Sequence, residues 1–158
     1  MAHEPPVVEL LPDAPEHRAL VARVRDAYRD QGLMPAMAAF AEGMKKDDDG
    51  SGPNPKIKLP PHAVARVERT RANLPLFVGR VVPAFMAYVP GTDRLKALSD
   101  RLVLAAGRDS RGELPHRAVA ALAERLGTGL HHFPGGHIGL TTHPAAFAEH
   151  LRDALGTR

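Results

Sequence analysis

The sequence predicts an α/β fold built around short parallel strands, and three observations support this prediction. A continuous apolar run at 102–106 ends at Gly107, which is typical of a strand buried on both faces. An amphipathic helix follows at 114–126, and a second short strand follows at 129–133, before a last helix that begins at Pro144. The predicted buried face of the first of these helices is Leu114, Ala118, Leu122 and Leu126. The order strand, helix, strand, helix predicts a βαβα unit with two parallel strands and a right-handed crossover.

The first 90 residues have helical patterns instead. Apolar residues recur at helical spacing over 16–30 and 34–44, and the predicted faces are Leu20, Val24, Ala27 and Tyr28, then Met37, Phe40, Ala41 and Met44. Residues 62–88 continue the helical pattern, and Pro75 and Pro83 are expected to kink or divide them. We therefore expect a helical cap or lid region over 1–90, followed by a C-terminal βαβα core segment over 91–158.

Residues 45–61 are rich in Gly, Pro, Asp and Lys, and we expect a flexible loop there. Asp47 to Gly52 match the opening positions of a calcium-binding EF loop. The match fails at its twelfth position, where Lys58 replaces the required glutamate, so the segment predicts no calcium site.

The segment from Leu74 to Tyr88 is strongly apolar, and two interpretations of it are open. Such a stripe is most often packed in a core, but it also suits the lining of a hydrophobic pocket beneath a lid. The second interpretation predicts a hydrophobic small-molecule ligand.

Composition narrows the classes of function. The 158 residues include no cysteine, which excludes disulfides, thiolate metal sites and a cysteine nucleophile. The formal net charge is +3, with basic and acidic residues interleaved, so no nucleic-acid surface is predicted. No apolar run approaches the length of a membrane span and no signal peptide is visible, which predicts a cytoplasmic protein with no membrane partner.

The nine histidines raise the question of a metal site. Four of them lie close together in the sequence: His131, His132, His137 and His143. Neighbouring residues of a strand point to opposite faces, so His131 and His132 do not easily join one site. No HExxH motif is present, and the glycines at 135–139 lack the spacing of a dinucleotide fingerprint. We therefore predict no metal and no cofactor.

Two strands are too few for a stable parallel sheet, because such sheets are normally larger and covered on both faces. The strand at 102–106 would expose an apolar, unpaired edge in a single chain, and such edges invite another strand. The sheet is thus expected to be incomplete in one chain and to be completed by a second copy, as a homodimer, or by a partner chain.

Several segments together resemble the C-terminal part of the α/β-hydrolase superfamily. They are Leu102–Gly112 (LVLAAGRDSRG), Leu114–Gly127 and Phe133–Leu140 (FPGGHIGL). The opening His3-Glu4-Pro5-Pro6 is similar to the segment after the strand that follows the nucleophile helix, and residues 7–90 resemble the helical cap of that family. The resemblance covers nearly the whole chain, and the nucleophile half of the family fold is not represented.

The resemblance implies a catalytic histidine and an orienting acid. His137 matches the family histidine, whose role is to take the proton of the nucleophile and later protonate the leaving group. Many family members place the acid three residues after the glycine that ends the strand, where this chain has Ser110. Asp109, one residue earlier, is therefore the candidate acid, and Glu113 is a weaker alternative.

No serine lies in a Gly-x-Ser-x-Gly elbow, since none of Ser51, Ser99 and Ser110 has glycines two residues away on both sides. The resemblance therefore implies a hydrolase of ester- or thioester-type small molecules that lacks its nucleophile, either a truncated hydrolase or a half-enzyme. This chain alone is expected to be inactive as a serine hydrolase. Two alternatives remain: a non-catalytic binding or assembly module, and an enzyme that uses His137 as a lone acid/base in an apolar pocket.

Overall fold

A computed structural model of the chain describes residues 1–44 and 61–156. The calcium-loop lookalike from Asp47 to Lys58 and most of the predicted loop at 45–61 lie outside these residues. The chain divides into two compact units. The first unit combines Met1–His17 with Phe85–Arg158, and the second is Arg18–Ala84.

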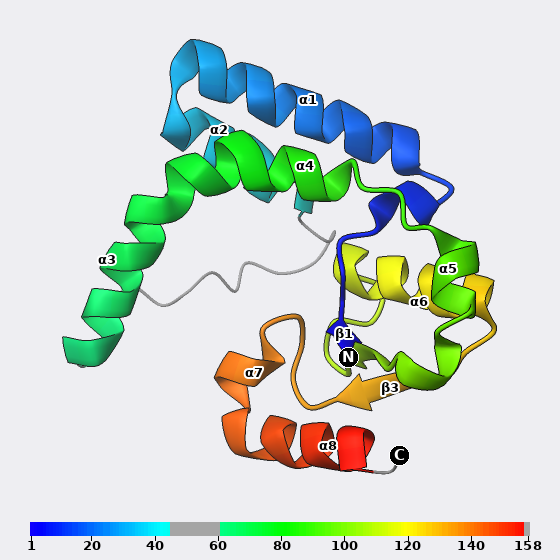
Figure 1. Ribbon diagram of the computed structural model, residues 1–158. Coiled ribbons are helices and arrows are strands. Elements are labelled where there is room, and N and C mark those ends of the chain that lie inside the picture. Colours follow the sequence, from blue (N-terminus) through cyan, green and yellow to red (C-terminus); the bar gives the residue numbers. More distant parts are fainter. Residues whose placement is uncertain (45–60, 157–158) are drawn as a thin grey trace. The chain divides into compact units, whose positions relative to one another are not determined.

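The first unit contains a parallel sheet of three strands, so the predicted α/β class is confirmed (Figure 1). The strands are β1 (Ala2–His3), β2 (Leu104–Gly107) and β3 (Leu130–Phe133), in the spatial order β1-β2-β3. Ala2 pairs with Leu104, which in turn pairs with Leu130. The sheet is not closed, in agreement with the predicted incomplete fold.

The predicted unpaired edge at 102–106 is wrong, because β1 pairs with β2 and makes it the central strand. The prediction missed β1 because a strand of two residues is too short to give an alternating pattern, and Pro5 and Pro6 follow at once. Among the described residues the open edges of the sheet belong to β1 and β3.

Helices cover both faces of the sheet, as parallel strands require. Helix α8 (Pro144–Gly156) packs on one face, where Ala105, Phe133 and Phe147 form a buried cluster. Helix α6 (Leu114–Leu126) covers the other face, and its His116 ring lies 5.8 Å from the ring of His132. Figure 1 shows α6 and α8 on opposite sides of β3. The buried residues of α6 are Ala118, Val119, Leu122, Ala123 and Leu126.

Helix α6 has the predicted bounds, and Gly127 ends it in the left-handed conformation with a φ of 67°. The short elements of this unit were not predicted, because three to five residues do not complete a hydrophobic period. These elements are the 3₁₀ helices η1 (Val8–Leu10) and η3 (Ser99–Arg101), and the helices α5 (Thr92–Lys96) and α7 (Gly139–Thr142).

The second unit is helical, and α1 (Ala14–Gln31) enters it from the first. The other elements are α2 (Leu33–Met44), α3 (Pro61–Leu76), the π-helical turn η2 (Phe77–Val81) and α4 (Val82–Met86). Its core is formed by Leu20, Val24, Ala36 and Val78, with Ala27, Tyr28, Met37 and Phe40 packed against them. The predicted faces are thereby confirmed for Leu20, Val24, Ala27, Tyr28, Met37 and Phe40, whereas Ala41 is exposed. No helix in the described part of the chain is long and apolar enough to cross a membrane.

The apolar segment 74–88 is divided by a π-helical turn before Pro83, as predicted, whereas α3 continues through Pro75. The ring of Pro83 removes a backbone donor and crowds the carbonyl four residues earlier, at Gly79, which lies inside the π-helical turn. Only part of the segment is core: Val78, Val82 and Met86 are buried, one every four residues. The larger side chains Leu76, Phe77, Phe85 and Tyr88 are exposed.

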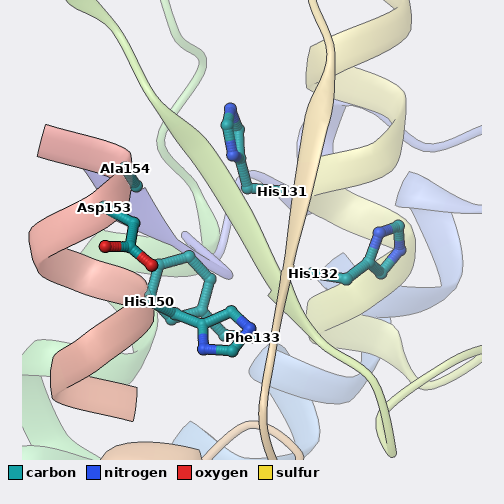
Figure 2. Close-up of a pocket in the computed structure, with 6 residues that line it drawn as sticks. All are labelled: His131, His132, Phe133, His150, Asp153 and Ala154. Atoms are coloured by element: carbon teal, nitrogen blue, oxygen red, sulfur yellow. The ribbon is translucent and has the colours of Figure 1, made fainter. Parts of the chain in front are cut away.

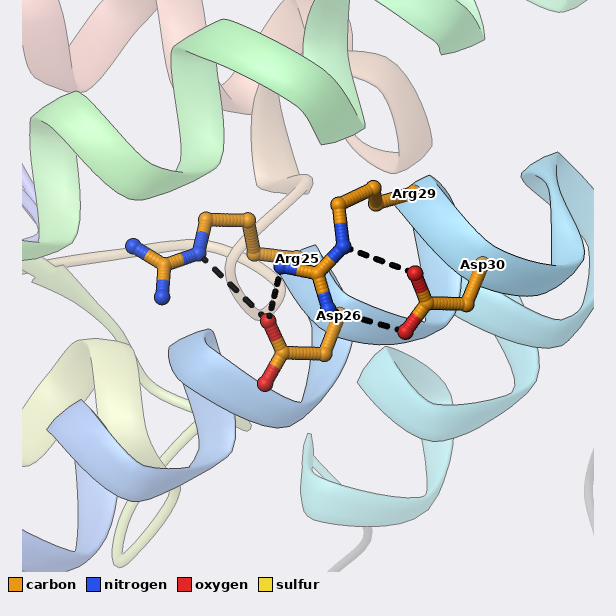
Figure 3. A network of polar contacts seen from close by, with 4 residues as sticks. All are labelled: Arg25, Asp26, Arg29 and Asp30. Atoms are coloured by element: carbon orange, nitrogen blue, oxygen red, sulfur yellow. Dashed lines mark hydrogen bonds and ion pairs between the residues drawn. The ribbon is translucent and has the colours of Figure 1, made fainter.

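The outer face of α1 carries a network of ion pairs (Figure 3). Arg29 lies 2.7 Å from the Asp30 carboxylate and 3.2 Å from that of Asp26, which also faces Arg25. All four side chains are exposed, so solvent screens these pairs and they contribute little to stability. They mark the polar face of the helix.

We predict that Gly107→Ala destabilises the chain by about 1–3 kcal/mol, because the added methyl group would overpack the interior. A Cβ at position 107 would lie 2.6 Å from backbone atoms of Gly135 and Gly136, which cannot move aside as a flexible side chain can. Urea denaturation measures the change in the free energy of unfolding.

Gly129→Ala is the matched control, because a Cβ there meets nothing within 4 Å. We expect its effect to be below about 1 kcal/mol. Equal effects of the two substitutions would contradict the close approach at Gly107.

Candidate functional site

The carboxyl ends of the three strands meet at one edge of the sheet, as they must in a parallel sheet. Glu4 follows β1, Gly107 ends β2, and the segment from Pro134 to His137 follows β3. Side chains distant in the sequence are therefore brought together at this edge.

The central contact of this edge joins Glu4 and His137. The Oε2 atom of Glu4 lies 2.8 Å from Nδ1 of His137. The Glu4 side chain is fully buried, whereas 53% of the His137 side chain is exposed. An ionised carboxylate only accepts hydrogen bonds, so Nδ1 carries the proton in this pair and Nε2 is the basic nitrogen of the neutral ring.

Three further hydrogen bonds hold Glu4. The backbone N–H of Gly107 donates to Oε1 at 2.9 Å, and the Ser110 hydroxyl donates to the same oxygen. The Glu4 N–H donates to the carbonyl of Ala105 at 2.9 Å, which continues the pairing of β1 with β2. Glu4 has a φ of 44°, a left-handed conformation that costs about 1–3 kcal/mol in a residue other than glycine. The surrounding bonds thus hold a strained residue with its carboxylate turned inward.

The loop that carries His137 is joined to the loop after β2. The N–H of Arg108 donates to the carbonyl of Phe133 at 3.0 Å, and the N–H of Asp109 donates to that of Gly135 at 3.2 Å. Gly135 has a φ of 77°, and a Cβ there would lie 2.6 Å from Nδ1 of His143. Only glycine suits this position, so the backbone of the loop requires Gly135.

Burial and hydrogen bonding have opposite effects on the pKa of Glu4. Burial opposes ionisation, but the bonds from His137, Ser110 and the Gly107 N–H outweigh it, so the pKa of Glu4 lies below its ordinary value. The hydrogen bond with Glu4 raises the pKa of His137 against the effect of burial, and the charges of Glu4 and Glu113 add to this rise. The arrangement therefore favours an ionised acid beside a strengthened base.

Of the three residues predicted from the sequence, His137 belongs to this pair, and Asp109 and Glu113 do not. His137 lies in the loop after β3. The carboxylate on its ring belongs to Glu4, whereas the predicted acid, Asp109, donates its backbone N–H to the carbonyl of Gly135. Glu113 acts on His137 through its charge. The sequence signal for Glu4 is an acidic residue in the His-Glu-Pro-Pro segment, but the two-residue strand before it is too short to be recognised from the sequence.

Three of the other histidines, His131, His132 and His150, lie together around a cavity. His131 and His132 point to opposite sides of β3, as predicted (Figure 2). A cavity of about 240 Å³ lies between β3 and α8, lined by His131, His132, Phe133, His150, Asp153 and Ala154. Neither Glu4 nor His137 lines it. Within the described ranges no group of three or more His, Asp or Glu side chains is placed to hold a metal ion.

The chain is similar to a distant relative among known proteins. The chain is 34% identical over 92 residues to a protein named uncharacterized hydrolase YraK, from Bacillus subtilis strain 168. The match covers 56% of this chain and 34% of that protein, so the chain spans about one third of its relative's length. No protein-family profile matches the chain. The relative's name supports a relationship to hydrolases.

We predict that Glu4→Gln lowers the pKa of His137, because the substitution removes the negative charge and the acceptor at Nδ1. A pH titration of the His137 ring protons by NMR measures the change. Asp109→Asn is the matched control and should leave the titration unchanged. If Asp109→Asn lowers the pKa and Glu4→Gln does not, Asp109 is the orienting acid.

The pair also predicts how stability depends on pH. The raised pKa of His137 gives stability that is complete below its ordinary value of 6.5 and is lost as the pH rises through the raised value. The lowered pKa of Glu4 gives stability that is complete above its ordinary value of 4.5 and is lost as the pH falls through the lowered value. Both contributions are therefore present between pH 4.5 and 6.5.

The test compares urea midpoints of the wild type and His137→Gln across this pH range. The difference between them should be greatest inside the window and should shrink on both sides. His143→Gln, which changes a ring bonded to Thr142, should lack this maximum. A difference that grows steadily above pH 6.5 would contradict the pairing of His137 with Glu4.

Proposed function

We propose that this chain carries the acid–histidine part of an α/β-hydrolase that acts on ester- or thioester-type small molecules. His137 is the general base and Glu4 is the acid that orients it. The bond between buried Glu4 and half-exposed His137 carries the proposal, because it leaves Nε2 as the basic nitrogen of an accessible ring. The hydrolase name of the distant relative supports the same class of reaction.

In the proposed reaction, Nε2 of His137 removes the proton of a nucleophile hydroxyl as the hydroxyl oxygen attacks the carbonyl carbon of the substrate. Glu4 stabilises the imidazolium ion that forms, and the same proton then passes from Nε2 to the leaving group. In the second step His137 activates a water molecule that releases the acyl group.

The nucleophile is proposed to belong to a segment outside this chain. Ser110 is unsuitable because its hydroxyl is buried and donates to Glu4, on the side of the carboxylate away from His137. Ser99 lies in a short 3₁₀ helix and has Ala97 and Arg101 where an elbow needs glycines. Activity then requires that the two parts act together.

The surroundings of His137 support a hydrophobic substrate. Ile138 and Leu140, on either side of Gly139, are 62% and 60% exposed. Large apolar side chains exposed beside an accessible base suit an apolar ligand or a covering element. We propose that the helical second unit is the cap that the family resemblance implies.

The test begins with the reading frame upstream of Met1. We expect an in-frame Gly-x-Ser-x-Gly, and an extended protein that hydrolyses p-nitrophenyl butyrate and is labelled on that serine by a fluorophosphonate. Glu4→Gln should lower kcat by about 10³–10⁴-fold, as loss of the orienting acid does in other triads. His137→Ala should abolish turnover, whereas Asp109→Asn should retain it.

A different outcome would favour the non-catalytic alternative. If no elbow precedes Met1 and no nucleophile-bearing protein restores activity when mixed with the chain, the hydrolase proposal is wrong. Turnover of the ester by the 158-residue chain alone, lost in His137→Ala, would instead favour the lone-histidine enzyme.

A further inference from the structure

The described core contains two buried polar side chains, Glu4 and Ser110, and they are bonded to each other. Ser110 is 1% exposed. A buried hydroxyl is costly unless it is hydrogen-bonded, so its presence in the core calls for a reason other than packing. The proposed chemistry assigns no step to Ser110.

The hydroxyl and the histidine bind opposite oxygens of the Glu4 carboxylate. The Ser110 hydroxyl and the Gly107 N–H both donate to Oε1, whereas Oε2 faces His137. The carbonyl of Gly107 lies 3.0 Å from the Ser110 Oγ and is a second acceptor for its single proton. An ionised carboxylate accepts more strongly than a neutral carbonyl, so the proton is directed to Glu4.

Ser110 is itself held by the start of helix α6. The N–H of Glu113, the residue before that helix, donates to the Ser110 carbonyl at 2.9 Å. The neighbouring Asp109 N–H is bonded to Gly135 in the histidine loop. The hydroxyl is therefore presented from a segment that is tied both to a helix and to the loop of His137.

We propose that Ser110 is a positioning residue that holds the Glu4 carboxylate in the plane needed to orient His137. The inference rests on the proposed function, in which His137 is the base. The terminal torsion of a glutamate side chain is broad and only roughly two-fold, so packing alone does not set the plane of its carboxylate. Two donors on Oε1 set that plane and leave Oε2 directed at Nδ1.

The test compares Ser110→Ala, which removes the hydroxyl with little change in volume, with Ser110→Thr, which keeps it. The readouts are the ¹⁵N shifts of the His137 ring, which report the fraction of the Nδ1–H tautomer, and the ¹³C titration of the Glu4 carboxyl. We expect Ser110→Ala to lower the Nδ1–H fraction and raise the pKa of Glu4, and Ser110→Thr to restore both. Ser99→Ala is the control at an exposed serine and should change neither.

Loss of stability alone would not produce this pattern, because a folded variant of lower stability keeps its tautomer and its carboxyl titration. A folded Ser110→Ala protein with both readouts unchanged would overturn the role of Ser110, and this comparison stands even if the threonine variant does not fold. If wild-type His137 shows no preference for Nδ1–H, and Glu4→Gln does not alter its titration, the proposed pairing fails as well. The two failures are thus distinguishable.

Discussion

The burial of one carboxylate governs the arrangement of the strand ends in the first unit. Glu4 is ionised inside the protein, and a buried charge is tolerated only when its oxygens are fully bonded. Its partners come from each neighbouring segment: Gly107 from β2, Ser110 from the following loop, and His137 from the loop after β3. The bonds that make this buried charge tolerable also bring Ser110 and His137 to the same carboxylate.

The fold was predictable wherever a hydrophobic period runs for several turns. Helix α6 has the predicted bounds, and the buried residues Leu20 and Val24 of α1 were identified from their spacing. Strand β1 was not, because two residues carry no period. The position of β1 in the sheet comes from its pairing with β2, which lies about a hundred residues later in the chain and has no local signature in the sequence.

The candidate site was likewise predictable only where its signal is local in the sequence. The Gly-Gly-His sequence directly after a strand is a local pattern, and His137 is predicted from that pattern alone. The carboxylate on its ring comes from 133 residues away, so no spacing rule links the two residues. Asp109 was preferred because it is near in sequence to the expected acid position. The parallel sheet, by aligning the carboxyl ends of its strands, instead brings the N-terminal Glu4 to the histidine.

The shortness of β1 has a consequence for the dynamics of the site. Local opening of a protein proceeds most readily where few backbone hydrogen bonds and few contacts hold a segment, and edge strands open before central ones. Glu4 is attached to the two-residue strand at the edge of the sheet, whereas His137 follows a longer strand. Fraying of β1 would withdraw the acid and leave the rest of the sheet intact. Opening of this short strand is therefore expected to separate Glu4 from His137 without unfolding the whole chain.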